Sequence, residues 1–370
     1  MDNLNAVTLS VNGLDYRGWT KVSISAGIER QSRDFKLDVT WRWPGQDTEI
    51  PVRQGDYCQV RIGDDLVLSG WIYSTPVSYD SKSVNRAIAG RSVTSDLVDC
   101  SAINKPGQWR GQSVQKIVQA LAEPYGVQVL SQAAETTKLA DHSIEPGETV
   151  FESIDRLLTL SRLLSTDDAR GRLVIIRPGS AGRAVDRLEL GQNILTGSAA
   201  LDFSGVFSEY RVTGQRSGTD EEFGEKASEV RASVTDPRAT RKRVLLIHES
   251  GQMTPTLAEA RANWERGNRM GKALTLQYKV QGWRQSNGAL WLPNMVVRVV
   301  DGLVGIDRDM LISEIEYSLD ENGTVANITV GPPDAFDPEP KDPHKARKLK
   351  KGGKADNFEY LIPADWKPGT

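Results

Sequence analysis

Side chains that could act as bases, nucleophiles or metal ligands lie far apart in this 370-residue chain. The three histidines fall in a polar linker (His142), at the end of an apolar segment (His248) and in the charged C-terminal region (His344). A zinc site or a general base needs partner groups at short, fixed spacings, and the sequence around these histidines does not supply them. We therefore expect no catalytic residue, no metal site and no cofactor.

Two pairs of adjacent acids, Asp64–Asp65 and Asp167–Asp168, could be read as the carboxylates of a glycosidase or of a metal site. Both pairs lie between apolar segments, where Asp is favoured because its side chain accepts hydrogen bonds in tight turns. Cys58 has no adjacent base and lies far from Cys100. This spacing favours two free thiols in a protein made in a reducing cytoplasm. We interpret these residues as turn and core positions.

The densest cluster of charge is the basic run His344–Lys354. It could neutralise nucleic-acid phosphates, but no aromatic residue lies within it and acidic stretches flank it. The alternative, which we favour, is a solvated tether that contacts an acidic partner surface. The net charge of −3 gives no further sign of a nucleic-acid or membrane partner.

The elements that must carry these side chains are mostly short strands in the first 95 residues. Phe35, Leu37, Val39 and Trp41 alternate with polar residues, as a half-buried antiparallel strand requires. Gly, Asp, Asn and Pro separate such segments at regular intervals. This spacing predicts a small barrel or sandwich over residues 1–95.

Helices are predicted in residues 96–183. Ser113 is a plausible N-cap, and Thr149 and Glu152 have the spacing of a capping box. Each helix precedes an apolar segment, residues 127–130 ("VQVL") and residues 172–178 ("RLVIIRP"). Two helix-then-strand units predict a small α/β insertion.

Strands return in residues 184–332 around one helix, for which Thr256 and Glu259 have capping-box spacing. The hairpin pattern "VRIGD" (60–64) recurs as "VRVVD" (297–301). We predict an α+β, mostly β fold, in which two similar antiparallel β-barrel domains (1–95 and 184–332) flank the α/β insertion (96–183). The predicted barrel-core residues are Val60, Ile62, Val297 and Val299.

The last region, residues 333–370, is rich in proline and lysine and nearly devoid of apolar side chains until "NFEYLIPADW". Such a composition does not offset the entropy of ordering, so we predict an extended tail that ends in a docking peptide. Its candidate partner-contact residues are Lys348, Lys350, Lys351, Phe358, Tyr360 and Trp366.

Longer stretches of the sequence resemble one family. They include "EARANWERGNRMGKA", "GALWLPNMVVRVVD", "GIDRDMLISEIEYSLDENGTVANITVGPPDAF", "GETVFESIDRLLTLSRLLSTDDARGRLVIIRPG" and "GDYCQVRIGDDLVLSGWI". Together they are similar to the baseplate hub proteins of contractile-tailed bacteriophages of the phage Mu kind, related to the late control D proteins. The resemblance covers about residues 1–336.

The resemblance implies a homotrimer whose two β-barrels per chain form a ring of pseudo-sixfold symmetry. Such a ring joins the hexameric tail tube protein to the trimeric central spike protein. It lines a channel for the tape measure and for DNA, which is only passing cargo. The α/β insertion would contact baseplate wedge proteins, and no membrane insertion is implied.

The expected function is therefore structural: a virion protein of the tail baseplate, synthesised in the host bacterial cytoplasm, and not an enzyme. One alternative is a tail-associated cell-wall-degrading enzyme, which would need a carboxylate pair in a cleft. Another is a receptor- or glycan-binding tail module, because the chain has nine tryptophans. Most of these, such as Trp41, Trp71 and Trp283, fall at strand or strand-end positions, where core or interface packing is the commoner role.

Overall fold

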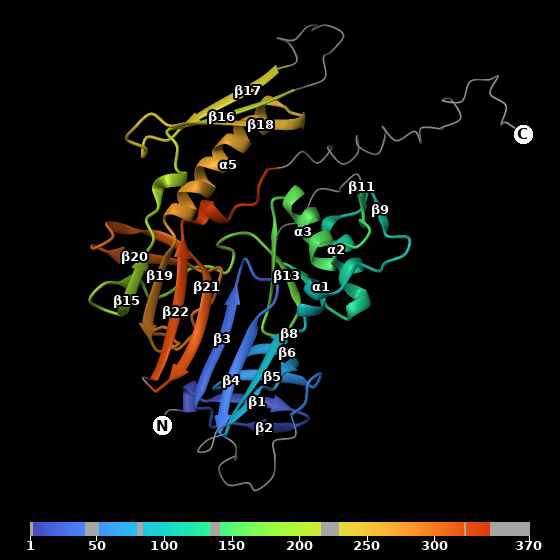
Figure 1. Cartoon of the computed structure of the whole chain (residues 1–370), viewed down its shortest axis with the longest axis vertical. Coiled ribbons are helices and arrows are strands. Elements are labelled where there is room, and N and C mark those ends of the chain that lie inside the picture. Colours follow the sequence, from blue (N-terminus) through green and yellow to red (C-terminus); the bar gives the residue numbers. More distant parts are fainter. Residues whose placement is uncertain are drawn as a thin grey trace, which may run out of the picture.

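One open sheet of fourteen strands runs through the computed structural model (Figure 1). The structure describes residues 3–40, 52–79, 84–133, 141–215, 229–321 and 323–340. Along the main path the strand order is β15-β19-β22-β21-β3-β4-β8-β6-β5-β1-β2, with β20 on β21, β14 on β20 and β7 on β8. The strands are β1 (Val7–Val11), β2 (Leu14–Tyr16), β3 (Lys21–Gly27), β4 (Asp34–Thr40), β5 (Tyr57–Ile62), β6 (Asp65–Ser74), β7 (Val77–Tyr79), β8 (Val84–Ser92), β14 (Leu188–Glu189), β15 (Ile194–Ala199), β19 (Leu276–Gln281), β20 (Val296–Asp301), β21 (Ile306–Asp320) and β22 (Gly323–Gly331).

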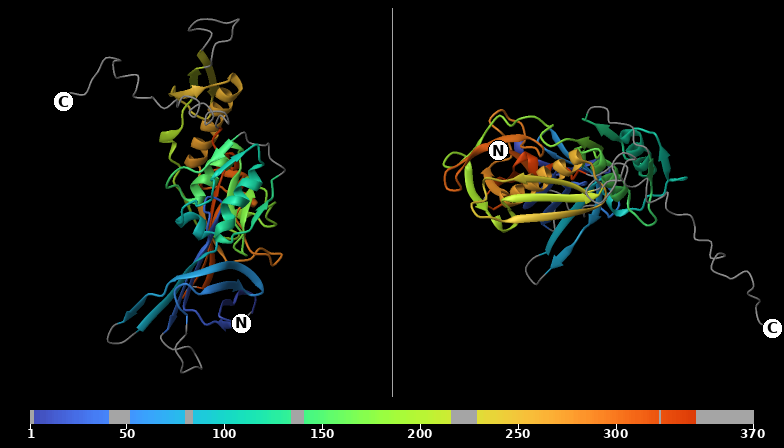
Figure 2. Two further views of the ribbon diagram at one scale, coloured as in Figure 1. Left: turned by 90° about the vertical axis from the view of Figure 1, so that its right-hand side faces the viewer. Right: turned by 90° about the horizontal axis from the view of Figure 1, so that it is seen from above.

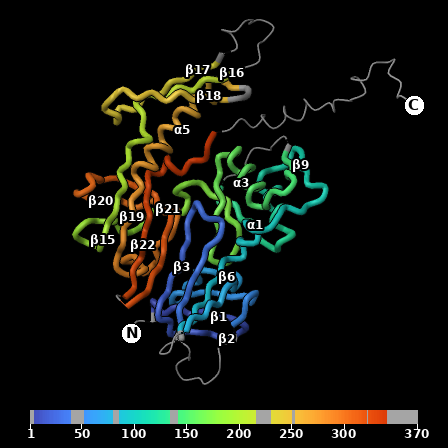
Figure 3. Tube along the Cα trace, in the orientation of Figure 1, coloured from blue at the N-terminus to red at the C-terminus, as the bar shows by residue number. Residues whose placement is uncertain are grey.

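The mostly β class is confirmed, but the strands that the structure describes do not close into two separate barrels. Instead, β3 pairs antiparallel with β21 and joins the N-terminal strands to the C-terminal ones. Figure 3 shows blue β3 and orange β21 in adjacent positions. The physical reason lies in β21, which is fifteen residues long. Strand β20 covers only its first part, so the backbone groups beyond it need another partner, which β3 supplies.

The largest hydrophobic cluster lies on this sheet and contains residues from both ends of the chain. Strands β5 and β20 alternate buried and half-exposed side chains along their length, as a sheet with one covered face requires. The four residues that the sequence places in a barrel core, Val60, Ile62, Val297 and Val299, all have 0% exposure.

The α/β module follows β8 and has its own core. It contains α1 (Ser95–Asp99), α2 (Val114–Ala122), α3 (Val150–Leu160), a sheet ordered β10 (Val129–Ser131), β13 (Leu173–Ile176), β12 (Leu164–Asp167), and the pair β9 (Gln108–Arg110) and β11 (Asp141–Ser143). Ser113 is the N-cap of α2, although its side chain makes no capping hydrogen bond. The predicted capping box of Thr149 and Glu152 is present at α3.

A third layer, formed by residues 209–273, lies between β15 and β19 in the chain and covers one end of the molecule (Figure 2). Its sheet has the order β17 (Glu229–Thr235), β16 (Glu209–Gln215), β18 (Val244–Gln252), and it packs on α5 (Pro255–Ala273). The predicted capping box at Thr256 and Glu259 is wrong, because the helix begins two residues earlier. Thr254 is the N-cap, its hydroxyl accepts from Leu257 N at 3.2 Å, and Pro255 occupies the first turn, where its missing N–H is no loss.

The described chain also has short 3-10 helices at Asn3–Asn5 (η1), Glu123–Tyr125 (η2), Phe203–Gly205 (η3) and Pro333–Phe336 (η4). In the part of the chain described here, no helix combines the length and the apolar character that a bilayer crossing demands.

Candidate functional site

The histidines of the described residues have partners within the fold. His142 on β11 is buried, and its Nε2 lies 2.9 Å from Ser153 Oγ of α3. His248 on β18 has its Nδ1 3.2 Å from Thr213 Oγ1 of the neighbouring strand. His344 lies outside the described residues. Among those that are described, no three His, Cys, Asp or Glu side chains gather in a way that could hold a metal ion.

Three of the four acids in the two pairs bond to arginine side chains. Asp167 is buried, and its Oδ1 lies 3.1 Å from Arg33 Nε. Burial raises the pKa of Asp167, and the Arg33 guanidinium opposes this rise. Asp168 accepts hydrogen bonds from Arg172 within its own turn. Asp65 lies 2.6 Å from Arg284 Nη1.

The two thiols are unpaired, as the sequence predicts. Cys58 is fully buried in β5, and burial raises its pKa to about 12. At neutral pH this residue is therefore a protonated, inert core side chain.

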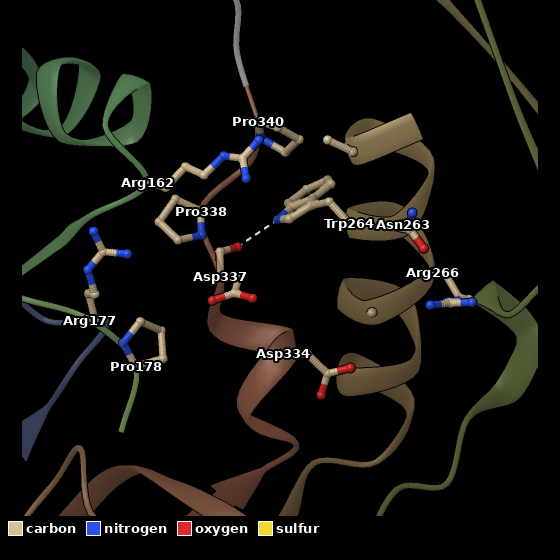
Figure 4. A pocket seen from close by; sticks show the side chains of 12 residues that line it. Arg162, Arg177, Pro178, Asn263, Trp264, Arg266, Asp334, Asp337, Pro338 and Pro340 are labelled. Atoms are coloured by element: carbon tan, nitrogen blue, oxygen red, sulfur yellow. Dashed lines mark hydrogen bonds between the residues drawn. The ribbon is translucent and has the colours of Figure 1, made fainter. Parts of the chain in front are cut away.

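One hollow of about 570 Å³ lies where the α/β module, α5 and the segment after η4 meet (Figure 4). Trp264 of α5 donates its indole N–H to the carbonyl oxygen of Asp337 at 2.6 Å. Arg162 and Arg177 line the opposite wall. Burial, and then the charge of Asp334, raise the pKa of Asp337. Its lining comes from the α/β module, from α5 and from η4 with the segment that follows it, so the hollow is a junction between three parts of the fold.

The sheet itself carries the strongest functional signal, because it contains the same strand arrangement twice. In the first β-unit (residues 7–92) the spatial order is β3-β4-β8-β6-β5, and every neighbouring pair is antiparallel. In the second β-unit (residues 188–331) the order is β15-β19-β22-β21-β20, again antiparallel throughout. The members of the two sets also follow one another in the same order along the chain.

The two β-units agree in register as well as in order. The long strand of each hairpin has an irregularity at the same place, between Ile72 and Ser74 in β6 and between Ile312 and Glu314 in β21. Ile72 pairs with Gly90, which pairs with Phe35. Ile312 pairs with Val330, which pairs with Leu276. Ile72, Gly90 and Phe35 are therefore equivalent to Ile312, Val330 and Leu276.

The strand pairing of the two hairpins shows that the alignment of "VRIGD" with "VRVVD" is displaced by two residues. Cys58 lies opposite Gly70, and Val297 lies opposite Met310. Gly70 and Met310 each precede the irregularity by the same number of residues, so Cys58 is equivalent to Val297. Val60 is therefore equivalent to Val299. The matching letters of "VRIGD" and "VRVVD" predict instead that Val60 is equivalent to Val297, and this prediction is wrong.

The place where the two β-units meet is the internal joint, formed by β3 and β21. Ser23 lies opposite Ser318, and Ile24 lies opposite Tyr317. Ser23 Oγ donates to Glu316 Oε1 at 2.6 Å, across the joint. The sequence patterns described above do not predict this joint. The available signal was the alternation in "MLISEIEYSLD", which continues well past the length of its hairpin partner "MVVRVV".

The candidate partner-contact residues of the tail, Lys348, Lys350, Lys351, Phe358, Tyr360 and Trp366, lie outside the described residues, and their role stays a prediction.

Three family models match successive parts of the chain. Residues 6–92 match the Mu phage baseplate assembly protein GpP-like N-terminal domain. Residues 94–177 match the second domain of the baseplate hub protein gp44-like family. Residues 254–339 match the fourth domain of the Mu phage baseplate assembly protein GpP.

Individual relatives give the same result over almost the full length. Baseplate hub protein gp44 of Escherichia phage Mu is 33% identical, across 94% of this chain and 93% of its own. The 43 kDa tail protein of prophage MuSo2 from Shewanella oneidensis is 32% identical, with a TM-score of 0.80 over 90% of this chain and 99% of its own. The tail protein from Neisseria meningitidis MC58, at 24% identity, shares the fold with a TM-score of 0.74 over 89% of this chain and 98% of its own. The sequence match, the family models and the shared fold agree, and the chain belongs to the Mu-type baseplate hub family of structural phage tail proteins.

Proposed function

We propose that three copies of this chain form a ring of pseudo-sixfold symmetry that joins the hexameric tail tube to the trimeric central spike of the baseplate. The observation that carries this proposal is the presence of two β-units in one register within one chain. Three chains then present six nearly equivalent sheets, so a threefold assembly offers a sixfold surface to the tube. The α/β module lies to one side of the sheet (Figure 1), and we assign it to contacts with wedge proteins.

In this role the protein turns over no substrate, and DNA and the tape measure pass through the ring as cargo. A cell-wall-degrading enzyme would need two carboxylates facing one substrate. Each of the two adjacent acid pairs in the sequence instead has a carboxylate that is bound to an arginine. Asp167 binds Arg33, and Asp65 binds Arg284. We place the protein in the virion after synthesis in the host cytoplasm.

A glycan-binding role has less support. Trp283 and Trp291 are buried, and the Trp283 indole donates to Val325 O at 2.9 Å. These side chains pack the core of the second β-unit and present no face to a sugar.

The test is the molar mass in solution, measured by light scattering over a range of protein and salt concentrations. A trimer of 40.8 kDa chains has a mass of 122.4 kDa, three times 40.8. A stable species of that mass, with six similar lobes in averaged electron images, is the expected result. A chain that stays monomeric at every concentration would overturn the proposed ring.

A further inference from the structure

We propose that β15 of one chain pairs antiparallel with β7 of the next copy, in the register that places Ser198 opposite Ser78. This inference rests on the proposed ring and deepens it, because it identifies the strand edges that join one chain to another. The partner is a second copy of this chain, and the template is the internal joint between β3 and β21.

Both strands of the internal joint, β3 and β21, have counterparts in the other β-unit. Ile24 of β3 pairs with Phe35, and Ala199 of β15 pairs with Leu276. Because Phe35 and Leu276 are equivalent, Ile24 is equivalent to Ala199. Ser23 is then equivalent to Ser198, and β15 is the counterpart of β3.

The counterpart of the second half of β21 is β7. Past its irregularity β21 continues along β22, where Tyr317 pairs with Ala326. In the first β-unit Val77 of β7 pairs with Arg86 of β8 in the same way. The equivalence of Ile72 with Ile312 makes Val77 equivalent to Tyr317, and Ser78 equivalent to Ser318. At the internal joint Ser23 faces Ser318, so the same joint between chains would set Ser198 against Ser78.

Both of these edges lack a partner strand among the residues that the structure describes. Strand β15 stands at the end of the sheet and pairs only with β19, while β7 pairs only with β8. Their apolar side chains are exposed: Leu195 by 51%, Val77 by 47% and Tyr79 by 81%. At the internal joint, the residues equivalent to Ala199 and Val77 are Ile24 and Tyr317, which are 1% and 3% exposed. The two strands that pair at the buried internal joint thus have counterparts at two open edges, one on β15 and one on β7.

The backbone of β7 is arranged to receive another strand. Pro76 has no N–H, and its carbonyl oxygen accepts from Ala87 N of β8 at 3.0 Å. In an antiparallel pair, successive residues turn their backbone groups to opposite edges. Pro76 and Ser78 therefore face β8, and Val77 and Tyr79 face the open edge with their N–H and carbonyl groups unpaired by any described strand. The proline removes a donor on the covered side only.

The contact is head-to-tail, since β15 of the second β-unit meets β7 of the first β-unit of another copy. Such a heterologous contact closes into a ring when its rotation allows. In the ring, internal joints would alternate with joints between chains. Both kinds would use the same strand positions, so each β-unit would meet its two neighbours in the same way.

The test is a disulfide between Ser78→Cys and Ser198→Cys, in a chain that also carries Cys100→Ser. Ser78 and Ser198 would form a non-hydrogen-bonded pair, with Cα atoms about 4.5 Å apart, which suits a disulfide. Cys58 stays in place because it is buried and its pKa is about 12. After mild oxidation, non-reducing gels should show covalent dimers and trimers.

Two matched variants calibrate the result. Ser23→Cys with Ser318→Cys forms the equivalent pair inside one chain, so it should cross-link without any increase in mass. Ser78→Cys with Thr196→Cys keeps the face but shifts the register by two residues. The Cα atoms then lie about 7–8 Å apart, too far for efficient bridging.

Light scattering of the same samples separates the two proposals. A 122.4 kDa species, three times 40.8 kDa, that cross-links through Ser78→Cys and Ser198→Cys but not through the shifted pair supports the inference. A species of that mass that fails to cross-link, although the intrachain pair does, overturns the strand pairing and leaves the ring standing. A monomer that forms no covalent oligomer overturns both.

Discussion

Arg33, the residue directly before β4, and Asp167 at the end of β12 are 134 residues apart in sequence and bound through several groups. Arg33 N donates to Asp167 Oδ2 at 3.0 Å, Arg33 Nε to Oδ1 at 3.1 Å, and Arg33 Nη2 to the Asp167 carbonyl oxygen at 3.1 Å. Arg33 Nη1 donates to Val67 O of the neighbouring hairpin at 2.9 Å. One guanidinium thus holds the α/β module against the first β-unit.

Removing this guanidinium should be strongly destabilising. Arg33→Ala leaves a buried carboxylate without its cation, which costs about 3–5 kcal/mol. Arg30→Ala is the matched control: Arg30 also bonds two carboxylates, but its side chain is 43% exposed, and the expected loss is below about 1 kcal/mol. Urea unfolding of both variants gives the comparison, and equal losses would show that the Arg33 contact is not specially stabilising.

A charge placed at the core of either hairpin should disrupt its β-unit. Val299→Asp or Ile62→Asp buries a carboxylate at a position with 0% exposure, with an expected loss above about 4 kcal/mol. Val299→Ala, which only deletes methyl groups, should lose about 2 kcal/mol. Thermal melting and light scattering follow folding and assembly together. An Asp variant with the parent's melting temperature and mass would contradict the core assignment.

The start of α5 can be tested with two neighbouring threonines. Thr254→Ala removes the hydroxyl that accepts from Leu257 N, and it should cost about 1 kcal/mol. Thr256→Ala changes an exposed side chain just inside the helix, where Ala is the better helix former, so stability should stay the same or rise. The reverse order of stabilities in urea would restore the capping box at Thr256.

Gly271 of α5 should resist a substitution that usually stabilises helices. A Cβ atom there would lie 1.9 Å from Ala335 Cβ of η4, so Gly271→Ala must displace η4. Gly→Ala inside a helix normally gains up to about 1 kcal/mol, whereas here the melting temperature should fall. At Gly267 the nearest atom would be Asp334 O at 3.3 Å. Gly267→Ala should therefore be milder, and a stabilising effect of Gly271→Ala would refute the tight packing of η4 on α5.

Alkaline pH should weaken the second β-unit through Tyr278. Burial, and then the hydrogen bond and charge of Asp301, raise the pKa of Tyr278 above its ordinary value of 10.0. Above pH 10 the unfolded chain loses this proton while the native chain keeps it, so the free energy of unfolding falls as pH rises. Tyr278→Phe should reduce the slope by up to about 1.4 kcal/mol per pH unit.

The same variant should lose about 1–3 kcal/mol at pH 7, because the Tyr278 hydroxyl donates to Asp301 Oδ2 at 2.9 Å. Urea titrations at neutral and alkaline pH give both quantities. An unchanged alkaline slope would mean that Tyr278 titrates alike in both states.

The sequence predicts those features whose causes lie within a few residues. Thr149 and Glu152 cap α3 because their side chains reach across one helical turn. The hairpins follow from alternation, which sets the faces of a strand. The start of α5 was missed because Thr254 and Thr256 are both N-cap residue types, and Pro255 decides between them.

Contacts between distant residues carry no such local pattern. The joint between β3 and β21 brings Ser23 to Ser318, and nothing in the period of either strand specifies the other as its partner. The prediction of two closed barrels failed for this reason, because closure depends on which distant edges pair. The contact between Arg33 and Asp167 was hidden in the same way: Asp167 reads as a turn residue until its partner is known.

The third layer is inserted at a position where the two β-units differ. Its strands and α5 stand between β15 and β19, where the first β-unit has only the short connection from β3 to β4. In the proposed ring, the paired backbones would repeat six times while this layer and the α/β module would each repeat three times. A partner that contacts the paired strands would therefore meet a surface of sixfold repetition. A partner that contacts the third layer or the α/β module would meet a surface of threefold repetition.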